Sequence, residues 1–252
     1  PGVEETCNNG VDDNCDGGAG DCAFSGTMSL GTADIIVEGE ETYEYTGSAI
    51  TQRCDLNGDG LADLVVSTPY DDLAGGRAGS VCVFFSSSLS ASFVTTSSCD
   101  VIFTGESPID FAGSALACGD VDGDGTDDLL IGAFGYDQDA TGAIYLFYGG
   151  TFSETVSLAD ADAKWTGTNE ESAVGERALA IADVNGDGLD DILVGVSNND
   201  AIGADAGAVY LINGGVLSGT SSLASADAKW TGEATNDSAG FSIAACDTNN
   251  DG

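Results

Sequence analysis

Nine residues decide the fold of this chain: Asp120-Val121-Asp122-Gly123-Asp124-Gly125-Thr126-Asp127-Asp128. Carboxylates stand at positions 1, 3, 5 and 9, and the glycine at position 6 permits a turn that a side chain would obstruct. Hard oxygens that converge in this way are typical of a calcium loop, in which position 7 offers only its backbone carbonyl. The stretch therefore predicts a Ca²⁺ site with Asp120, Asp122, Asp124, Thr126 and Asp128 as ligands.

The same pattern recurs along the chain at a nearly constant spacing, with its first aspartates at Asp55, Asp120, Asp183 and Asp247. The further predicted ligands are Asp55, Asn57, Asp59, Leu61 and Asp63, then Asp183, Asn185, Asp187, Leu189 and Asp191, and finally Asp247, Asn249 and Asp251. Such a period is too long for one turn of a solenoid and is typical of a β-propeller blade with generous loops.

Each repeat also contains short segments that predict strands. Apolar runs at 64–66, 129–133 and 192–196 follow the loops, as expected of strands buried on both faces. The remaining strand segments are 79–85, 142–148 and 207–212, the outer segments 33–39, 100–105, 161–167 and 226–232, and the first strands 47–50, 113–116 and, more loosely, 240–243. We expect an all-β fold of three complete four-stranded antiparallel units, with an orphan fourth strand (33–38) and an orphan first strand (240–246).

The order Phe111-Ala112-Gly113-Ser114, loop, Leu129-Leu130-Ile131-Gly132-Ala133-Phe134 resembles the FG-GAP repeat of integrin α-subunit β-propellers and their bacterial relatives. The resemblance covers residues 33–252, although Phe-Ala-Gly replaces Phe-Gly and Phe134 stands where the family has proline. It implies a partial propeller over residues 23–252 and calcium loops between the first and second strands of each blade. It does not imply the identity of a ligand.

Residues 1–22 predict a separate cysteine- and aspartate-rich element. Its sequence resembles the MopE-type metal-binding motif of exported bacterial proteins, with Asp12, Asn14 and Asp16 at ligand positions 1, 3 and 5. Position 9 is Gly20, and the acid comes one residue later at Asp21. Two interpretations stay open, a metal site and a turn held only by disulfides.

The loops could also belong to EF-hands or dockerin-type repeats, which begin with the same pattern. Position 12 argues against both, because Val66, Ile131 and Val194 cannot supply a bidentate carboxylate. Since every repeat has a loop, we expect structural ions that clamp strand connections rather than one catalytic metal. Magnesium fits less well because it demands a smaller octahedral site.

Charge and cysteine content limit the possible partners and compartment. The formal net charge of −38 repels nucleic acid and anionic membranes. Eight cysteines without any histidine predict disulfides and therefore an extracellular or cell-surface protein. We expect a Cys82–Cys99 disulfide within one blade, whereas the pairing of Cys54, Cys118 and Cys246 stays open. No apolar run is long enough for a membrane span, and Pro1 begins no signal peptide, so we expect a processed or excised part of a longer exported protein.

The two tryptophans, Trp165 and Trp230, each stand in Lys-Trp-Thr-Gly, and Phe103 takes the corresponding place one repeat earlier. Carbohydrate stacking is possible for such residues, but their repetition favours packing in the core. No histidine-based triad or G-x-S-x-G elbow is present, so we predict that the chain is not an enzyme.

These observations predict a calcium-stabilised binding or adhesion module of an exported bacterial protein. Its partner would be an extracellular protein or glycan. The alternative is a structural subunit that assembles with copies of itself through open sheet edges into a filament or surface layer. A polysaccharide-acting enzyme domain is the third possibility.

Overall fold

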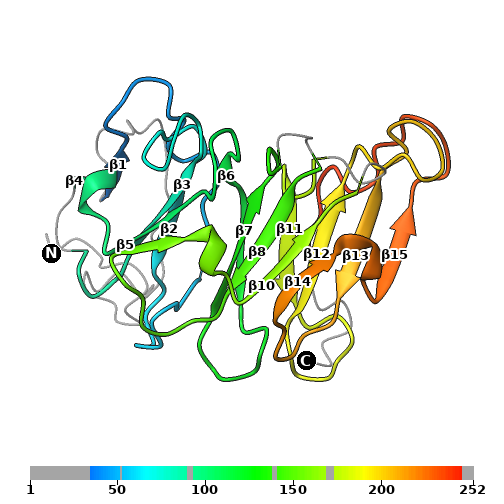
Figure 1. The fold of residues 1–252 in the computed structure, drawn as a ribbon. Helices are drawn as coiled ribbons and strands as arrows, with labels where there is room; N and C mark the ends of the chain where they lie inside the picture. The colour runs from blue at the N-terminus through cyan, green and yellow to red at the C-terminus, as the bar shows by residue number, and fades with distance from the viewer. Residues whose placement is uncertain (1–34, 52, 90–92, 138–140, 169–172, 246–252) are drawn as a thin grey trace, which may run out of the picture. The chain divides into compact units, whose positions relative to one another are not determined.

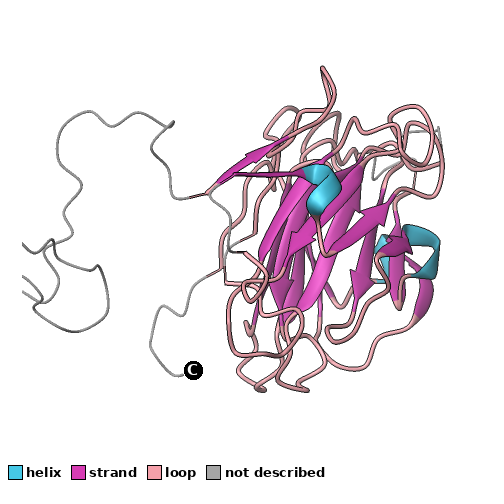
Figure 2. Ribbon diagram, turned by 90° about the vertical axis from the view of Figure 1, so that its left-hand side faces the viewer, coloured by secondary structure: helices cyan, strands magenta, loops and turns pink. Residues whose placement is uncertain are grey.

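The computed structural model describes residues 35–51, 53–89, 93–137, 141–168 and 173–245. The chain divides into a small unit, 1–36, and a large unit, 37–252, and the boundary falls inside the first strand. The N-terminal element predicted for residues 1–22 lies outside the described residues. The described part is all-β, and its helices are single 3-10 turns (Figure 2). This finding confirms the predicted fold class.

The second repeat contributes four strands to one sheet. Its strands are β6 (Ala112–Gly119), β7 (Asp128–Ala133), β8 (Ala143–Phe147) and β10 (Ala163–Thr166), and neighbouring strands run antiparallel. The third repeat has the same order, with β11 (Ala178–Ala182), β12 (Asp191–Val196), β13 (Ala208–Ile212) and β15 (Ala228–Thr231). Both repeats are therefore four-stranded antiparallel blades, as the sequence predicts.

The first repeat is less regular. It contributes β2 (Leu64–Thr68), β3 (Ser80–Phe84) and β5 (Val101–Thr104) to one sheet. Its expected first strand is reduced to two isolated bridges, Ile50 to Val66 and Cys54 to Asp63. Arg53, with a left-handed φ of 60°, interrupts the extended conformation between these two bridges.

Short strands from each repeat also extend the sheet of the preceding repeat, an arrangement that the sequence prediction missed. Strand β9 (Thr155–Ser157) of repeat 2 pairs in parallel with β5 of repeat 1. Strand β14 (Gly219–Ser222) of repeat 3 pairs in parallel with β10 of repeat 2. Strand β4 (Phe93–Thr95) pairs with β1 (Ile36–Glu38), which is the outer strand expected at 33–38. In the strand order of their sheets, β9 and β14 are the outermost strands. Figure 1 shows β14 beside β10 and β4 beside β1.

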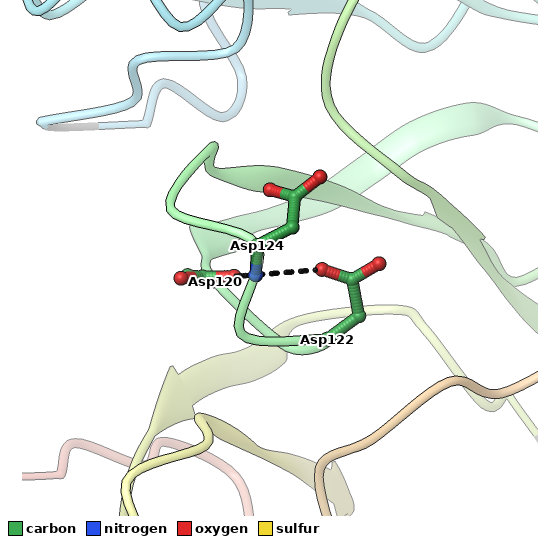
Figure 3. Close-up of side chains that lie close together, drawn as sticks. All are labelled: Asp120, Asp122 and Asp124. Carbon is green, nitrogen blue, oxygen red and sulfur yellow. Dashed lines mark hydrogen bonds between the residues drawn. The ribbon is translucent and has the colours of Figure 1, made fainter.

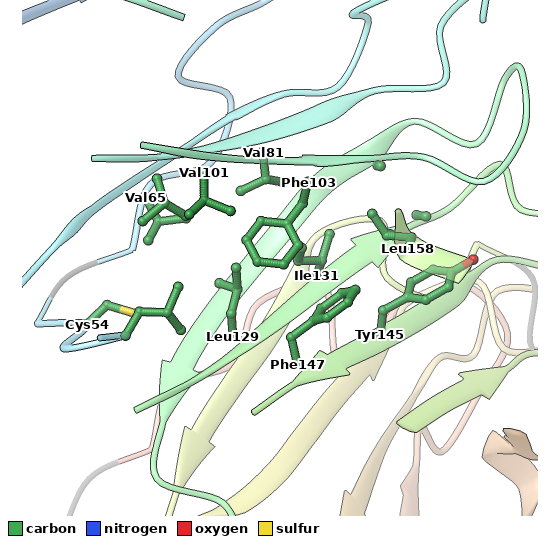
Figure 4. Packing of buried hydrophobic residues seen from close by; sticks show 14 of the residues in the cluster. Cys54, Val65, Val81, Val101, Phe103, Leu129, Ile131, Tyr145, Phe147 and Leu158 are labelled. Atoms are coloured by element: carbon green, nitrogen blue, oxygen red, sulfur yellow. The ribbon is translucent and has the colours of Figure 1, made fainter. Parts of the chain in front are cut away.

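Two buried clusters join consecutive sheets. On β7, Leu129 and Ile131 belong to the cluster shared with repeat 1 (Figure 4). Leu130 belongs to the cluster shared with repeat 3. Alternate residues of a strand point to opposite faces, so β7 is buried on both sides, as its uninterrupted apolar sequence predicts. Phe103 and Trp165 are buried as expected, with 0% and 6% of their surfaces exposed.

Two predictions at the C-terminal side are wrong. Residues 240–245 form no strand, because the described residues offer no second strand of a fourth repeat with which they could pair. Trp230 is not a core residue in this structure, since 54% of its surface is exposed.

Two disulfides are present among the described cysteines. Cys82 pairs with Cys99, which confirms the predicted disulfide within one blade. Cys54 pairs with Cys118, so the ends of the first-strand segments of repeats 1 and 2 are joined. Cys246 lies outside the described residues.

Candidate metal centres in the repeat loops

The loop between β6 and β7, residues 120–128 (loop 2), brings three carboxylates together. Asp120, Asp122 and Asp124 each place one carboxylate oxygen within 4.8 Å of the others (Figure 3). Asp120 accepts hydrogen bonds from the backbone amides of Asp124 (3.1 Å) and Gly125 (2.9 Å), which fold the loop around its first side chain. Asp122 accepts one from the amide of Asp124 at 3.1 Å. Burial raises the pKa of Asp122, and a bound cation would oppose this effect.

The corresponding loops of repeats 1 and 3, residues 55–63 (loop 1) and 183–191 (loop 3), have the same geometry. Asp55 accepts from the amides of Asp59 and Gly60, and Asp183 accepts from those of Gly186 and Gly188. The Gly188 amide is the main reason why the pKa of the Asp183 carboxyl is lowered. Position 3 is asparagine in both loops, and its side-chain oxygen accepts from the position 5 amide at 2.9 and 2.8 Å.

Glycines at positions 4 and 6 make this fold possible. In loop 2, Gly123 and Gly125 have φ of 78° and 90°, and the glycines of the other two loops have φ between 71° and 88°. Residues with a side chain rarely adopt this left-handed region. Position seven follows this turn and is occupied by Leu61, Thr126 and Leu189, each of which donates its amide to the aspartate at position five.

The position 9 aspartates lie inside the fold and not in the group of three. Asp63, Asp128 and Asp191 are 4%, 1% and 0% exposed. Asp128 accepts from the amides of Val121 (2.8 Å) and Gly149 (2.9 Å), so it ties the start of the loop to the end of β8. Burial raises the pKa of Asp128 to about 7, although these two hydrogen bonds act in the opposite direction. A nearby cation would stabilise the charged form of such a carboxylate.

Position 8 has a role that the sequence analysis did not identify. The Asp127 carboxylate accepts from the backbone amide of Asp55 at 2.7 Å, and the Asp127 amide donates to the Asp55 carbonyl at 3.1 Å. Asp190 makes the same two contacts with Asp120, both at 3.1 Å. Each position 8 aspartate thus fastens its loop to position 1 of the preceding loop. The only sequence signal is that loops 2 and 3 end in two consecutive aspartates, whereas loop 1 has Ala62 before its last aspartate.

The donor set of each described loop therefore fits a hard divalent cation. In loop 2 the carboxylate oxygens of positions 1, 3 and 5 lie within 4.8 Å of one another. In loops 1 and 3 the asparagine oxygen at position 3 accepts the position 5 amide in the same way, and the loop backbone has the turn that such a site requires. The candidate ligands of the fourth loop, Asp247, Asn249 and Asp251, and of the N-terminal motif, Asp12, Asn14, Asp16 and Asp21, lie outside the described residues.

Aromatic residues gather at the opposite end of the strands. Tyr45, Tyr70, Phe111 and Phe134 form a row in which neighbouring ring centroids are 4.7 to 5.0 Å apart. They come from loops that follow second strands or precede first strands, so they lie at the end of the strands away from loops 1 to 3. Tyr45 is 60% exposed and leaves one end of the row open to a partner.

The Lys164 side chain contacts one carboxylate and two aromatic rings. Its ammonium is 2.8 Å from a Glu106 carboxylate oxygen and lies 3.7 and 4.8 Å from the ring centroids of Tyr136 and Tyr145. The side chain of Lys164 is only 12% exposed. This lysine therefore neutralises a partly buried acid.

Comparisons with known proteins agree with this architecture. The FG-GAP repeat model matches residues 46–84 and 177–212, and the model of an FG-GAP-like repeat matches residues 120–194. Integrin alpha-PS5 of Drosophila melanogaster is 29% identical over 171 residues, which are 66% of this chain and 16% of the relative. Integrin alpha-5 of Xenopus laevis is 30% identical over 181 residues, which are 68% and 16%.

One of the relatives that match this chain has the name of an enzyme. Phosphatidylinositol-glycan-specific phospholipase D of Dictyostelium discoideum is 27% identical over 210 residues, which are 74% of this chain and 21% of the relative. The chain thus spans about a fifth or less of the length of these relatives. In the described part of the chain, no helix has the length and apolar character of a membrane span.

Proposed function

We propose that this chain, an FG-GAP and integrin-like domain, is an extracellular β-propeller binding or adhesion module whose repeat loops hold structural calcium. The observation that carries the proposal is the same loop, in which the position 1 aspartate accepts amides of the turn, at the same strand connection in three successive repeats. In loop 2 this conformation brings three carboxylates together. A catalytic site would be expected once, in a pocket, whereas a stabilising ion is expected in every blade.

Positions 1, 3, 5, 7 and 9 of each loop would hold the ion. When bound, Ca²⁺ would neutralise carboxylates that otherwise repel one another, in a chain of net charge −38. The protein itself supplies the backbone amides that orient the carboxylates and the buried position 9 aspartate that connects the loop to the next strand pair. Calcium would thus hold the first two strands of each blade together.

The end of the strands with the aromatic row is the surface proposed for the partner. Exposed tyrosines provide rigid contact area at low entropic cost, and they suit either an extracellular protein or a glycan. Glu44, Asp71 and Asp72 lie beside Tyr45 and Tyr70 and favour a partner with positive groups. The module itself needs no catalytic group, and the whole sequence contains no histidine.

Calcium titration tests the structural part of this proposal. Isothermal titration calorimetry of the metal-free chain should show one Ca²⁺ bound by each of the three described loops. The variant Asp124→Ala, which removes the side-chain oxygen at position 5, should lose one site, whereas the control Asp160→Ala, at an exposed acid outside the loops, should lose none. Undiminished binding by the Asp124 variant would refute the assignment.

The binding part is tested separately. The calcium-loaded chain is screened against immobilised extracellular proteins and glycans, and each hit is repeated with Tyr45→Ala. This variant should retain the melting temperature, because Tyr45 is largely exposed, and should lose binding. If a partner bound the Tyr45 variant as tightly as the unmodified chain, the binding surface would lie elsewhere.

Self-assembly into a filament or surface layer is a second candidate function. The observation that favours it is the outer strand of repeat 3, which no other strand covers within the described residues and whose edge could pair with another chain. Light scattering at rising protein concentration in calcium should show growing particles if the chain assembles, and a constant monomer mass if it does not.

A further inference from the structure

Three asparagines in the described part of the chain, Asn57, Asn185 and Asn213, are each followed by glycine. Asparagine loses its side-chain amide most readily before glycine, because glycine has no side chain to shield its backbone nitrogen. That nitrogen gives up its proton and bonds to the asparagine Cγ, the Cγ–Nδ2 bond breaks, and ammonia leaves with the proton. Water then opens the cyclic imide to aspartate or isoaspartate. A hydrogen bond that holds the glycine N–H therefore opposes the reaction.

Carboxylates hold two of the three glycine amides. Gly186 donates to the Asp183 carboxylate at 2.7 Å, and Gly214 donates to the Asp191 carboxylate at 2.8 Å. Asp191 is fully buried, so water does not compete for the second contact. A negative acceptor stabilises the N–H group and opposes the loss of its proton, so both nitrogens are poor nucleophiles.

The amide of Gly58 donates no hydrogen bond to any of the described residues. In loops 2 and 3 the glycine at position 4 donates to the aspartate at position 1, at 2.8 and 2.7 Å. In loop 1 the position 1 aspartate, Asp55, accepts from the amides of positions 5 and 6 but not from that of Gly58. Gly58 is also exposed, so water and base reach its nitrogen. Asn57 therefore has the neighbour best able to attack it.

We propose that Asn57 is a site of spontaneous deamidation, at which ligand position 3 of loop 1 changes from an amide to a carboxylate. The aspartate product would give loop 1 the acids that loop 2 has at positions 1, 3 and 5. The isoaspartate product would add one carbon to the backbone, so the loop oxygens would lose the spacing of a calcium loop. The reaction itself does not depend on calcium, whereas its effect on a metal site rests on the proposed function.

Exposure alone predicts a different order of reaction. Asn185 and Asn213 are exposed, whereas Asn57 is only partly exposed. A hydrogen bond to a charged acceptor is strong enough to slow the attack about tenfold or more. We therefore expect Asn57 to react at least about tenfold faster than either of the other two asparagines in the folded chain.

Peptide mapping by mass spectrometry tests this order on the intact, metal-free chain in mildly alkaline buffer. Fragment spectra locate each mass increase, and the chain unfolded in urea is the control because the reacting pair is the same at all three sites. In urea the three asparagines should react at similar rates, and in the folded chain Asn57 should react first. Asn57→Gln should lose the early product, since glutamine would have to close a six-membered ring.

Two variants of loop 3 test the cause of this order. Asp183→Ala removes the acceptor of the Gly186 amide, so the rate at Asn185 should rise towards the rate at Asn57. The matched control Asp187→Ala also removes an acid of loop 3 but leaves that hydrogen bond in place, so the rate at Asn185 should stay low.

Calcium separates this proposal from the proposed function. If loop 1 binds the ion through the Asn57 side-chain oxygen, saturating calcium should slow the reaction at Asn57 several-fold, and Asn57→Asp should bind calcium in loop 1 more tightly. If the loops bind no calcium, the rate at Asn57 is the same with and without the ion, while Asn57 still reacts first. The second result would contradict the calcium assignment and support the deamidation site.

Three results overturn the proposal. One is a rate at Asn185 or Asn213 that equals the rate at Asn57 in the folded, unmodified chain. Another is an intact Asn57 in the folded chain after the time in which the chain in urea has reacted completely. The last is the same rate at Asn185 in the Asp183 and Asp187 variants, because the hydrogen bond of the glycine would then not control the reaction.

Discussion

Replacement of Asp127 by alanine should weaken the fold through a contact with the preceding repeat. The Asp127 carboxylate accepts the backbone amide of Asp55 at 2.7 Å, and nothing in an alanine side chain can replace it. A hydrogen bond to a charged group contributes about 1.5 to 3 kcal/mol. Asp127 is only partly buried, so we expect a loss of about 1.5 to 2 kcal/mol in the free energy of unfolding.

The assay is urea denaturation at saturating calcium, where the proposed ions would neutralise carboxylate repulsion within the loops, so that this repulsion does not mask the lost hydrogen bond. Asp127→Asn retains an oxygen acceptor and should lose less than half as much as Asp127→Ala. Asp160→Ala removes an exposed acid outside the loops and should change stability by less than about 0.5 kcal/mol. Equal effects of the alanine and asparagine variants, or no effect of either, would refute the role assigned to this carboxylate.

Three further predictions concern the core, the disulfide and pH. Leu158→Ala should cost about 3 kcal/mol in urea denaturation, because the side chain is 1% exposed at the contact between repeats 1 and 2; a cost below about 1 kcal/mol would contradict its place in the core. Replacing Cys54 and Cys118 by serine should cost about 4 kcal/mol from the 64-residue loop they close, and unchanged stability would argue against this pairing. In metal-free protein, Asp128 binds its proton more tightly when folded, with a pKa of about 7 against 3.8, so stability should rise as pH falls from about 7 towards 4; Asp128→Asn should flatten this dependence in denaturation curves recorded across that range.

The sequence predicted the features that have a strong local pattern. The D-x-[DN]-x-D-G pattern has a fixed spacing, and the short apolar runs after it, bounded by turn residues, fit buried strands, so the loop segments and the strands that follow them were placed correctly. The Cys82–Cys99 disulfide followed from the position of both residues in one blade. Phe103 and Trp165 were assigned to the core because the same position is aromatic in successive repeats.

Contacts between repeats could not be predicted in this way. Strand β9, Thr155–Ser157, is short and mostly polar, has no periodicity, and pairs with a strand of the preceding repeat that lies far away in the sequence. Asp127 and Asp190 look like ordinary loop acids, and their role depends on the neighbouring loop that the fold brings close. Trp230 was assigned to the core by analogy with Trp165, but Trp165 is buried in a cluster shared with the strands of the following repeat, and the described residues after β15 form no further sheet.

Differential scanning calorimetry with and without calcium tests the central claim most directly. A ligand at 100 times its dissociation constant stabilises a fold by about 2.7 kcal/mol per site, so three occupied loops should contribute roughly 8 kcal/mol. For a domain of this size we therefore predict a melting temperature more than about 10 °C higher in calcium than in EDTA at equal ionic strength. The same melting temperature in both solutions would contradict the account, because the repeated loops would then be ordinary acidic turns.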